Sequence, residues 1–189
     1  SYNTAGEITF GGTKTLNGHT LDQNMFAFEL YDMTSDPING TLLDTAFNKA
    51  DGTYTFKPVK YTLNDVKDKT GADFIRTYLI KERNDKKDGY TYDKTEYEVT
   101  VQLADAGNGQ ITTTVTSIKK SGTEVSQDSS TNLNNYSFDF INTYEAKATF
   151  TPTATKRVLP ATRKQELESG SFKFNLKGTK LGANEAFPD

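Results

Sequence analysis

The chain of 189 residues contains no cysteine and no tryptophan, and its single histidine is His19. Without cysteine it can form neither a disulfide framework nor a thiolate metal site. One histidine in the turn sequence "NGHT" is too little for a histidine-based zinc site or a catalytic triad. The sequence therefore predicts no metal, no cofactor and no enzymatic activity on an external substrate.

Long apolar runs and an excess of one charge are also lacking. No stretch of 18 apolar residues occurs, and the first residues, "SYNTAGEITF", have neither a charged region nor an apolar region of the signal-peptide type. We therefore expect no membrane span within this segment. The 22 basic and 25 acidic residues are dispersed and give a net charge of −3, so nucleic acid is not an expected partner.

What the chain does contain is alternating segments rich in threonine, phenylalanine and tyrosine, separated by turn sequences such as "DPING" and "DAGNG". Short alternating segments with frequent turns are typical of an all-β sandwich of antiparallel strands. The expected strands are Glu7 to Leu16, Met25 to Tyr31, Leu42 to Phe47, Thr53 to Tyr61, Phe74 to Arg83, Thr95 to Leu103, Gln110 to Ile118 and Tyr136 to Tyr144. Only Thr62 to Gly71 indicates a helical turn, with Asn64 as its cap and Gly71 at its end.

An internal repeat divides the chain. The segment "LDQNMFAFEL" from Leu21 returns as "LESGSFKFNL" from Leu167 with its four apolar positions at the same spacing, and the upstream Lys14 is matched by Lys156. We therefore predict a complete domain over residues 1–146. Residues 147–189 are predicted to be the opening strands of a second, similar domain, because too few residues follow to complete its sheets.

Three polar residues lie on otherwise apolar strand faces. With a period of two, Lys14 shares a face with Phe10, and Glu82 shares one with Ile80. In "YSFDFINTYEA", Asn142 falls on the face of the aromatic residues. Burial lowers the pKa of a lysine and raises the pKa of a glutamate, so both neutral forms are favoured.

A neutral amine, a carboxamide and a protonated carboxyl form a reactive set. The Lys14 amine can attack the Asn142 side-chain carbon and release ammonia, while Glu82 polarises the carbonyl and transfers protons. The product is an amide bond that joins the first and last strands of the domain. The alternative is a structural Lys14–Glu82 ion pair beside a hydrogen-bonded Asn142.

Several landmarks in order resemble a family of Gram-positive surface domains. They are "TFGGTKTLNG" with Lys14, "FAFEL", "DGTYTF", "YLIKE" with Glu82, "GYTYDKTEYEVTVQLADAGNG" and "FDFINTYEA" with Asn142. Together they resemble the streptococcal-type pilin and adhesin repeat domains, which have a CnaB-like immunoglobulin fold. The resemblance covers roughly residues 6–146 and implies a spontaneous Lys14–Asn142 isopeptide bond with Glu82 as the catalyst.

The same resemblance implies a structural repeat of a cell-wall-attached surface protein or pilus, outside the cell, with neighbouring repeat domains or pilin subunits as partners. Lys156 is then the candidate cross-link lysine of the next domain, although this chain holds no glutamate or asparagine partner for it. The sequence "VLPATR" matches a sortase signal only superficially, because Arg163 follows the threonine and no apolar tail is present.

An adhesin domain that binds a host matrix protein or a glycan is the alternative function. Sugar-binding sandwiches stack their ligands on exposed aromatic rings, and Tyr90 and Tyr92 in "DGYTYD" are the candidates for that role. Asp51, Asp105 and Asn108 lie in turn sequences without EF-hand spacing, so we expect them to stabilise hairpin turns and not to bind calcium.

Overall fold

A computed structural model of the chain describes residues 4–155, 179–181 and 184–186, the last two ranges by their backbone alone. Among these residues the regular structure consists of β-strands and three short 3-10 turns, with no α-helix. The chain divides into two compact units, Ser1–Lys147 and Ala148–Asp189. The predicted all-β class is confirmed, and the first unit is the domain that carries the candidate site.

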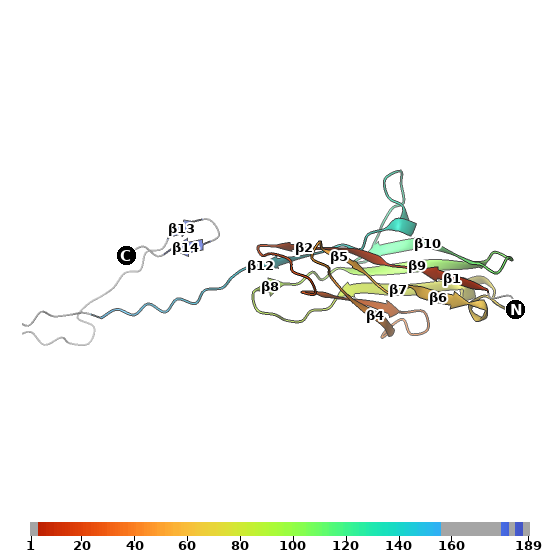
Figure 1. The fold of residues 1–189 in the computed structure, drawn as a ribbon, viewed down its shortest axis with the longest axis horizontal. Helices are drawn as coiled ribbons and strands as arrows, with labels where there is room; N and C mark the ends of the chain where they lie inside the picture. Colours follow the sequence, from red (N-terminus) through yellow and green to blue (C-terminus); the bar gives the residue numbers. More distant parts are fainter. Residues whose placement is uncertain (1–3, 156–178, 182–183, 187–189) are drawn as a thin grey trace, which may run out of the picture. The chain divides into compact units, whose positions relative to one another are not determined.

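One face of the first unit is a six-stranded antiparallel sheet with the order β11-β10-β9-β7-β3-β4 (Figure 1). Its strands are β3 (Ala27–Asp32), β4 (Thr41–Phe47), β7 (Ile75–Glu82), β9 (Glu96–Asp105), β10 (Ile111–Lys120) and β11 (Thr123–Glu124). Alternate residues of β9 are buried and exposed along the strand, as expected for a sheet with one face on a core and one in solvent.

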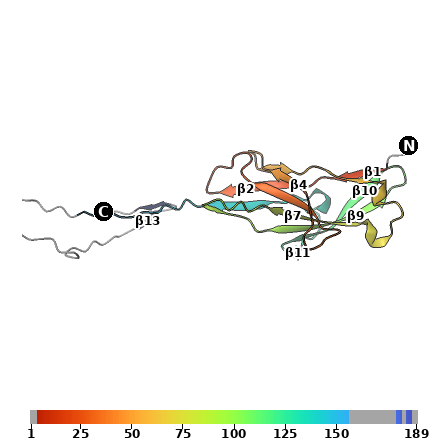
Figure 2. The same ribbon diagram turned by 90° about the horizontal axis from the view of Figure 1, so that it is seen from below.

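The opposing sheet has four strands in the order β5-β2-β12-β8, and β1 pairs with β6 as a separate ribbon. These strands are β1 (Ala5–Ile8), β2 (Gly11–Asn17), β5 (Thr53–Thr55), β6 (Val59–Thr62), β8 (Tyr90–Thr91) and β12 (Phe140–Tyr144). Figures 1 and 2 show the β1–β6 ribbon at the end of the unit near the N-terminus.

The pairing of β2 with β12 differs from the predicted antiparallel arrangement, because these two strands run parallel. Phe140 pairs with Lys14 and Asn142 with Leu16. Two parallel strands need a long connection, and here the chain from the end of β2 to the start of β12, nearly the whole domain, forms that connection. The first and last long strands of the sheet are therefore direct neighbours.

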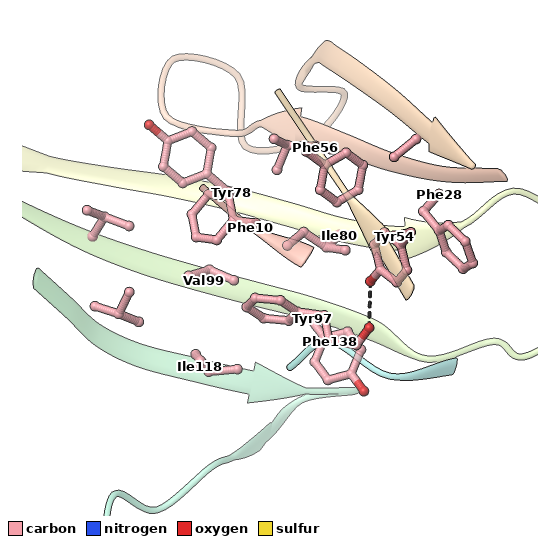
Figure 3. Packing of buried hydrophobic residues seen from close by; sticks show 14 of the residues in the cluster. Phe10, Phe28, Tyr54, Phe56, Tyr78, Ile80, Tyr97, Val99, Ile118 and Phe138 are labelled. Carbon is pink, nitrogen blue, oxygen red and sulfur yellow. Dashed lines mark hydrogen bonds between the residues drawn. The ribbon is translucent and has the colours of Figure 1, made fainter. Parts of the chain in front are cut away.

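Aromatic side chains from both sheets fill the space between them (Figure 3). Phe28 of the six-stranded sheet stacks on Tyr54 of the other sheet at 3.9 Å between ring centroids, and Tyr97 meets Phe140 edge to face at 5.4 Å. The buried Tyr54 hydroxyl donates a hydrogen bond to the Phe138 carbonyl, which satisfies it inside the core. The sheets therefore enclose a packed, largely aromatic interior, as the predicted sandwich requires.

Two expected strands are each divided in two. Glu7 to Leu16 forms β1 and β2, and Thr53 to Tyr61 forms β5 and β6. Both breaks occur where the chain changes partner, since β1 pairs with β6 whereas β2 pairs with β5. Pro58 lies in the second break, where a residue without an N–H group costs no ladder hydrogen bond.

The predicted helical turn takes a different form. A 3-10 turn spans Leu63–Asp65, and its cap is Thr62, whose backbone N–H donates to the Asp65 carboxylate at 2.7 Å, so the assignment of Asn64 was wrong. Gly71 does not end this turn but begins a second one, Gly71–Phe74, with a φ of 53°.

The second unit contains a short antiparallel hairpin of β13 (Thr179–Leu181) and β14 (Asn184–Ala186). The repeat segment from Leu167 and the candidate Lys156 lie outside the described residues. The proposal that residues 147–189 begin a second, similar domain therefore stays a prediction.

Candidate functional site

Lys14 lies in the middle of β2 with its side chain in the core. The residue is 3% exposed, whereas its neighbours Thr13 and Thr15 are exposed on the other face. The alternation read from the sequence is confirmed, because it requires Lys14 to share the inward face. The Lys14 Nζ lies 4.7 Å from the centroid of the Phe26 ring, so the amine is held against an apolar wall.

Glu82 is the last residue of β7 and points toward Lys14 from the opposing sheet. Its Oε1 lies 2.6 Å from Lys14 Nζ, and both side chains are fully buried. The contact has the length of an ion pair, but its angles fall outside hydrogen-bond geometry. Glu82 Oε2 accepts no hydrogen bond from any described residue, which disfavours a fully ionised carboxylate at this position.

Asn142 completes the site from β12 and has no exposed surface. Its Nδ2 donates to Glu82 Oε1 at 3.0 Å, and its Oδ1 accepts from the backbone N–H of Asp93 at 2.7 Å. The orientation of the amide follows from the second contact, because a backbone N–H can only donate and must face the oxygen. Both polar atoms of this buried amide therefore have a hydrogen-bond partner.

Burial dominates the protonation of the site. Desolvation lowers the pKa of Lys14, although Glu82 and then Asp93 oppose the shift by their negative charge. Desolvation likewise raises the pKa of Glu82, against the opposing effects of Lys14 and of the hydrogen bond from Asn142. Both shifts favour the uncharged amine and the uncharged carboxyl, which is the reactive combination.

The three predicted residues therefore meet at one point, where Glu82 Oε1 contacts both nitrogens. One detail differs from the sequence expectation that Glu82 polarises the Asn142 carbonyl. The carboxyl group faces Nδ2, and the carbonyl oxygen faces the Asp93 backbone. Glu82 Oε1 thus contacts the two nitrogens of the site, and its hydrogen bond from Asn142 comes from the amide nitrogen and not from the carbonyl side.

Comparison with protein families shows which family the domain matches. Residues 10–145 match the family described as "FctA: Spy0128-like isopeptide containing domain", and this range covers most of the chain. The chain belongs to this family. The match includes Lys14, Glu82 and Asn142 and confirms the resemblance to a Gram-positive pilin domain. No curated protein matches the sequence.

Solved structures similar to this isopeptide-containing domain include two Streptococcus pyogenes major pilins. One has 21% identity and a TM-score of 0.40 over 74% of this chain and 50% of its own. The other has 18% identity and a TM-score of 0.41 over 75% of this chain and 54% of its own. A C-terminal fragment of the pilus adhesin SpaC from Lactobacillus rhamnosus GG has 18% identity and a TM-score of 0.43, over 77% of this chain and 48% of its own. The chain thus spans about half the length of these structures.

Two residues of this FctA-type domain escaped the sequence analysis. Asn48 is buried, accepts a hydrogen bond from the Phe26 N–H and donates to the Asp22 and Lys49 carbonyls, so it holds the chain next to the site. Asp93 lies in the "YDKT" sequence after β8, and its contact with Asn142 depends on two strands far apart in the sequence. The Asp-x-Thr spacing predicts a turn at that position but no contact with the site.

The remaining candidates lie elsewhere in the domain. Tyr92 is buried and Tyr90 half-buried, and both pack edge to face on Phe26, so neither offers an exposed ring for a sugar. Asp51 accepts hydrogen bonds from Thr53, as expected for a turn residue. Among the described residues, no cluster of metal-ligating side chains occurs. The same residues include no helix that is long and apolar enough to cross a membrane.

Proposed function

We propose that this domain is a structural repeat of a Gram-positive pilin or surface stalk, in which a spontaneous isopeptide bond joins Lys14 to Asn142 with Glu82 as the catalyst. The family match supports the structural role. The single observation that carries the chemistry is that one buried carboxyl oxygen of Glu82 touches both the amine and the carboxamide nitrogen.

The contacts support the following sequence of steps. The neutral Lys14 Nζ attacks Asn142 Cγ and forms a tetrahedral intermediate. Glu82 accepts a proton from Nζ and supplies a proton to Nδ2, which leaves as ammonia. The new bond joins Nζ to Cγ, the bond from Cγ to Nδ2 breaks, and Glu82 returns to its starting state. No oxidant, metal or cofactor takes part in this balance.

The cross-link would join β2 and β12 covalently. Closing a loop of about 130 residues stabilises a fold by roughly 4–5 kcal/mol, by analogy with a disulfide and in a model-dependent way. The gain comes from the unfolded state, which can no longer separate its two ends. The domain would thus withstand conditions that unfold the same sandwich without its bond.

The wider role follows from the family and the repeat. We place the protein outside the cell on a cell wall or pilus, with neighbouring repeat domains or pilin subunits as its partners. Residues 147–189 would begin the next domain of the array, with Lys156 as its cross-link lysine. Autocatalytic cross-linking is then the only reaction this domain performs.

The intact mass of the purified chain tests the chemistry. We expect a mass about 17 Da below that of the sequence, the loss of one ammonia. Glu82→Ala should restore the full mass and lower the thermal midpoint by roughly 10–20 °C, from the stabilisation estimated above. Glu98→Ala, an exposed glutamate on β9, is the matched control and should keep the lower mass.

An unreduced mass in the wild-type chain would instead favour the structural ion pair between Lys14 and Glu82. In that case Glu82→Ala would still destabilise the domain, because it leaves a buried amine without its partner. The mass therefore separates the two interpretations, whereas the thermal midpoint alone does not.

A further inference from the structure

The carbonyl oxygen of Asn142 has a single donor among the described residues, the backbone N–H of Asp93. The donor lies 2.7 Å from Oδ1, at the short end of the range for such hydrogen bonds. Glu82 is on the other side of the carboxamide and touches only the nitrogen. Among the described residues, the oxygen that must accept negative charge during the attack therefore has Asp93 as its one hydrogen-bond donor.

The end of the β8–β12 ladder explains why this N–H is free to face a side chain. Thr91 pairs with Thr143, and continuing the same register would place Asp93 opposite Ile141. The backbone pairing of β8 with β12 ends at Thr91, before Asp93, and the Asp93 carboxylate instead accepts the hydrogen bond of the facing β12 backbone N–H. One of its oxygens accepts from the Ile141 N–H at 2.8 Å, and the other accepts from the Thr95 N–H at 2.9 Å.

These two hydrogen bonds fix the position of the Asp93 backbone relative to Asn142. The bond to Ile141 ties Asp93 to the residue next to Asn142 in β12, and the bond to Thr95 closes a turn within the same segment. The Asp93 carboxylate is half-buried, and although desolvation opposes it, hydrogen bonds from Thr95 and Ile141 lower its pKa. It stays ionised as an anchor and is not a proton carrier.

We propose that Asp93 is a further catalytic residue of this reaction, whose backbone N–H stabilises the oxyanion formed on Asn142 and whose carboxylate holds that N–H in place. The inference rests on the proposed isopeptide chemistry and adds the group that the three-residue set lacks. When Lys14 Nζ adds to Cγ, the carbonyl electron pair moves to Oδ1. A fixed donor already within hydrogen-bond distance stabilises that charge without reorganisation.

The test compares Asp93→Ser with Asp51→Ser. Both aspartates form the same Asp-x-Thr turn, but only Asp93 has a second oxygen bound to β12. A serine hydroxyl can still accept from the residue two positions on, so the local turn is kept while the tie to Ile141 is lost. Asp93→Asn is the second variant, because it keeps the size and one acceptor.

Pulse-labelled chains from cell-free synthesis are quenched at timed intervals, and the loss of ammonia is followed by intact mass. We expect Asp93→Ser and Asp93→Asn to react at least about tenfold more slowly than the wild type, since removal of one oxyanion donor costs about 100-fold or more in enzymes. Asp51→Ser should react at the wild-type rate. Wild-type rates in both Asp93 variants would overturn the inference while leaving the proposed function intact.

A spectroscopic readout separates catalysis from a loss of structure. In the unreacted Glu82→Ala background, the amide proton of residue 93 should resonate downfield and exchange slowly, and Asp93→Ser should shift it upfield. A slower reaction with an unchanged amide resonance would assign the effect to another cause and overturn the inference. If the wild-type chain loses no ammonia at all, the proposed function fails first and the role of Asp93 fails with it.

Discussion

Lys14 and Glu82 are the two titratable groups of the site, and Lys14 Nζ lies 2.6 Å from Glu82 Oε1 inside the core. Burial lowers the pKa of Lys14 from 10.5 and raises the pKa of Glu82 from 4.5, so the uncharged pair is favoured. The two groups together then carry the same number of protons as an ordinary ion pair, but with the proton on the carboxyl. In the proposed reaction, this location would leave the amine free to attack at pH values where an exposed lysine is an ammonium.

The rate of cross-linking should therefore form a plateau through neutral pH. On the acid side, below the lowered pKa of Lys14, the amine is protonated and the attack is blocked. On the alkaline side, above the raised pKa of Glu82, the carboxyl loses the proton that the leaving nitrogen needs. Timed intact-mass measurements between pH 4 and 11 check this dependence. A rate that rises steadily up to pH 10.5 would indicate an ordinary, solvated lysine.

At the scale of the element, the seam, meaning the parallel pairing of β2 with β12, sets the register of Lys14 and Asn142. The Asp139 carboxylate accepts from the Thr13 N–H at 3.0 Å and from the Thr13 hydroxyl at 2.7 Å. The Phe138 N–H donates to the Gly11 carbonyl at 3.1 Å, just before the parallel ladder begins. These contacts hold β2 and β12 in the register in which Lys14 pairs with Phe140 and Asn142 with Leu16.

Gly12 is the tightest point of this seam, because a side chain there would place its Cβ 1.9 Å from the Phe138 carbonyl oxygen. Gly12→Ala should push β12 away from β2, lower the thermal midpoint and slow the loss of ammonia. The exposed Thr15→Ala in the same strand is the control and should leave both unchanged. Timed mass and thermal unfolding measure the two effects, and an unaffected reaction in Gly12→Ala would show that the seam does not set the register.

The period-two alternation made the inward positions of Lys14, Glu82 and Asn142 predictable, because a residue's face depends only on its own strand. The parallel pairing of β2 with β12 was not predictable in this way, since alternation gives no information on which strands are neighbours. The role of Asp93 depends on that pairing and on the end of the β8 ladder, so it too required the three-dimensional arrangement. The breaks between β1 and β2, at Phe10, and between β5 and β6, at Pro58, likewise mark changes of pairing partner, which cannot be read from the sequence of one strand.

At the scale of the whole molecule, the core of the first unit buries several tyrosines. Tyr61 and Tyr78 place their hydroxyls 2.6 Å apart, whereas Tyr54 and Tyr97 donate to the carbonyls of Phe138 and Asp139. Burial raises the pKa of Tyr61 to about 12 and raises the pKa of Tyr54, Tyr78 and Tyr97 above the ordinary value. All four phenols favour the folded state only while they remain protonated.

Alkaline pH should therefore unfold the domain cooperatively. Because the folded pKa of Tyr61 exceeds the unfolded value of 10.0, its contribution is complete below pH 10.0 and is lost as the pH rises through about 12. The thermal midpoint of the Asn142→Ala variant, which cannot cross-link, should fall progressively above pH 10, and Tyr61→Phe in that background should reduce the slope. A midpoint that stays constant to pH 12 would contradict this account.

The parallel neighbours β2 and β12 also decide how the domain responds to tension. When the chain is pulled from both ends, β2 and β12 are drawn in opposite directions along their shared ladder, so its hydrogen bonds are loaded in shear and must yield together. With the proposed bond in place, the load passes from Lys14 directly to Asn142. The residues between them then carry no force, and the stretched domain would lengthen no further than its short flanking segments allow.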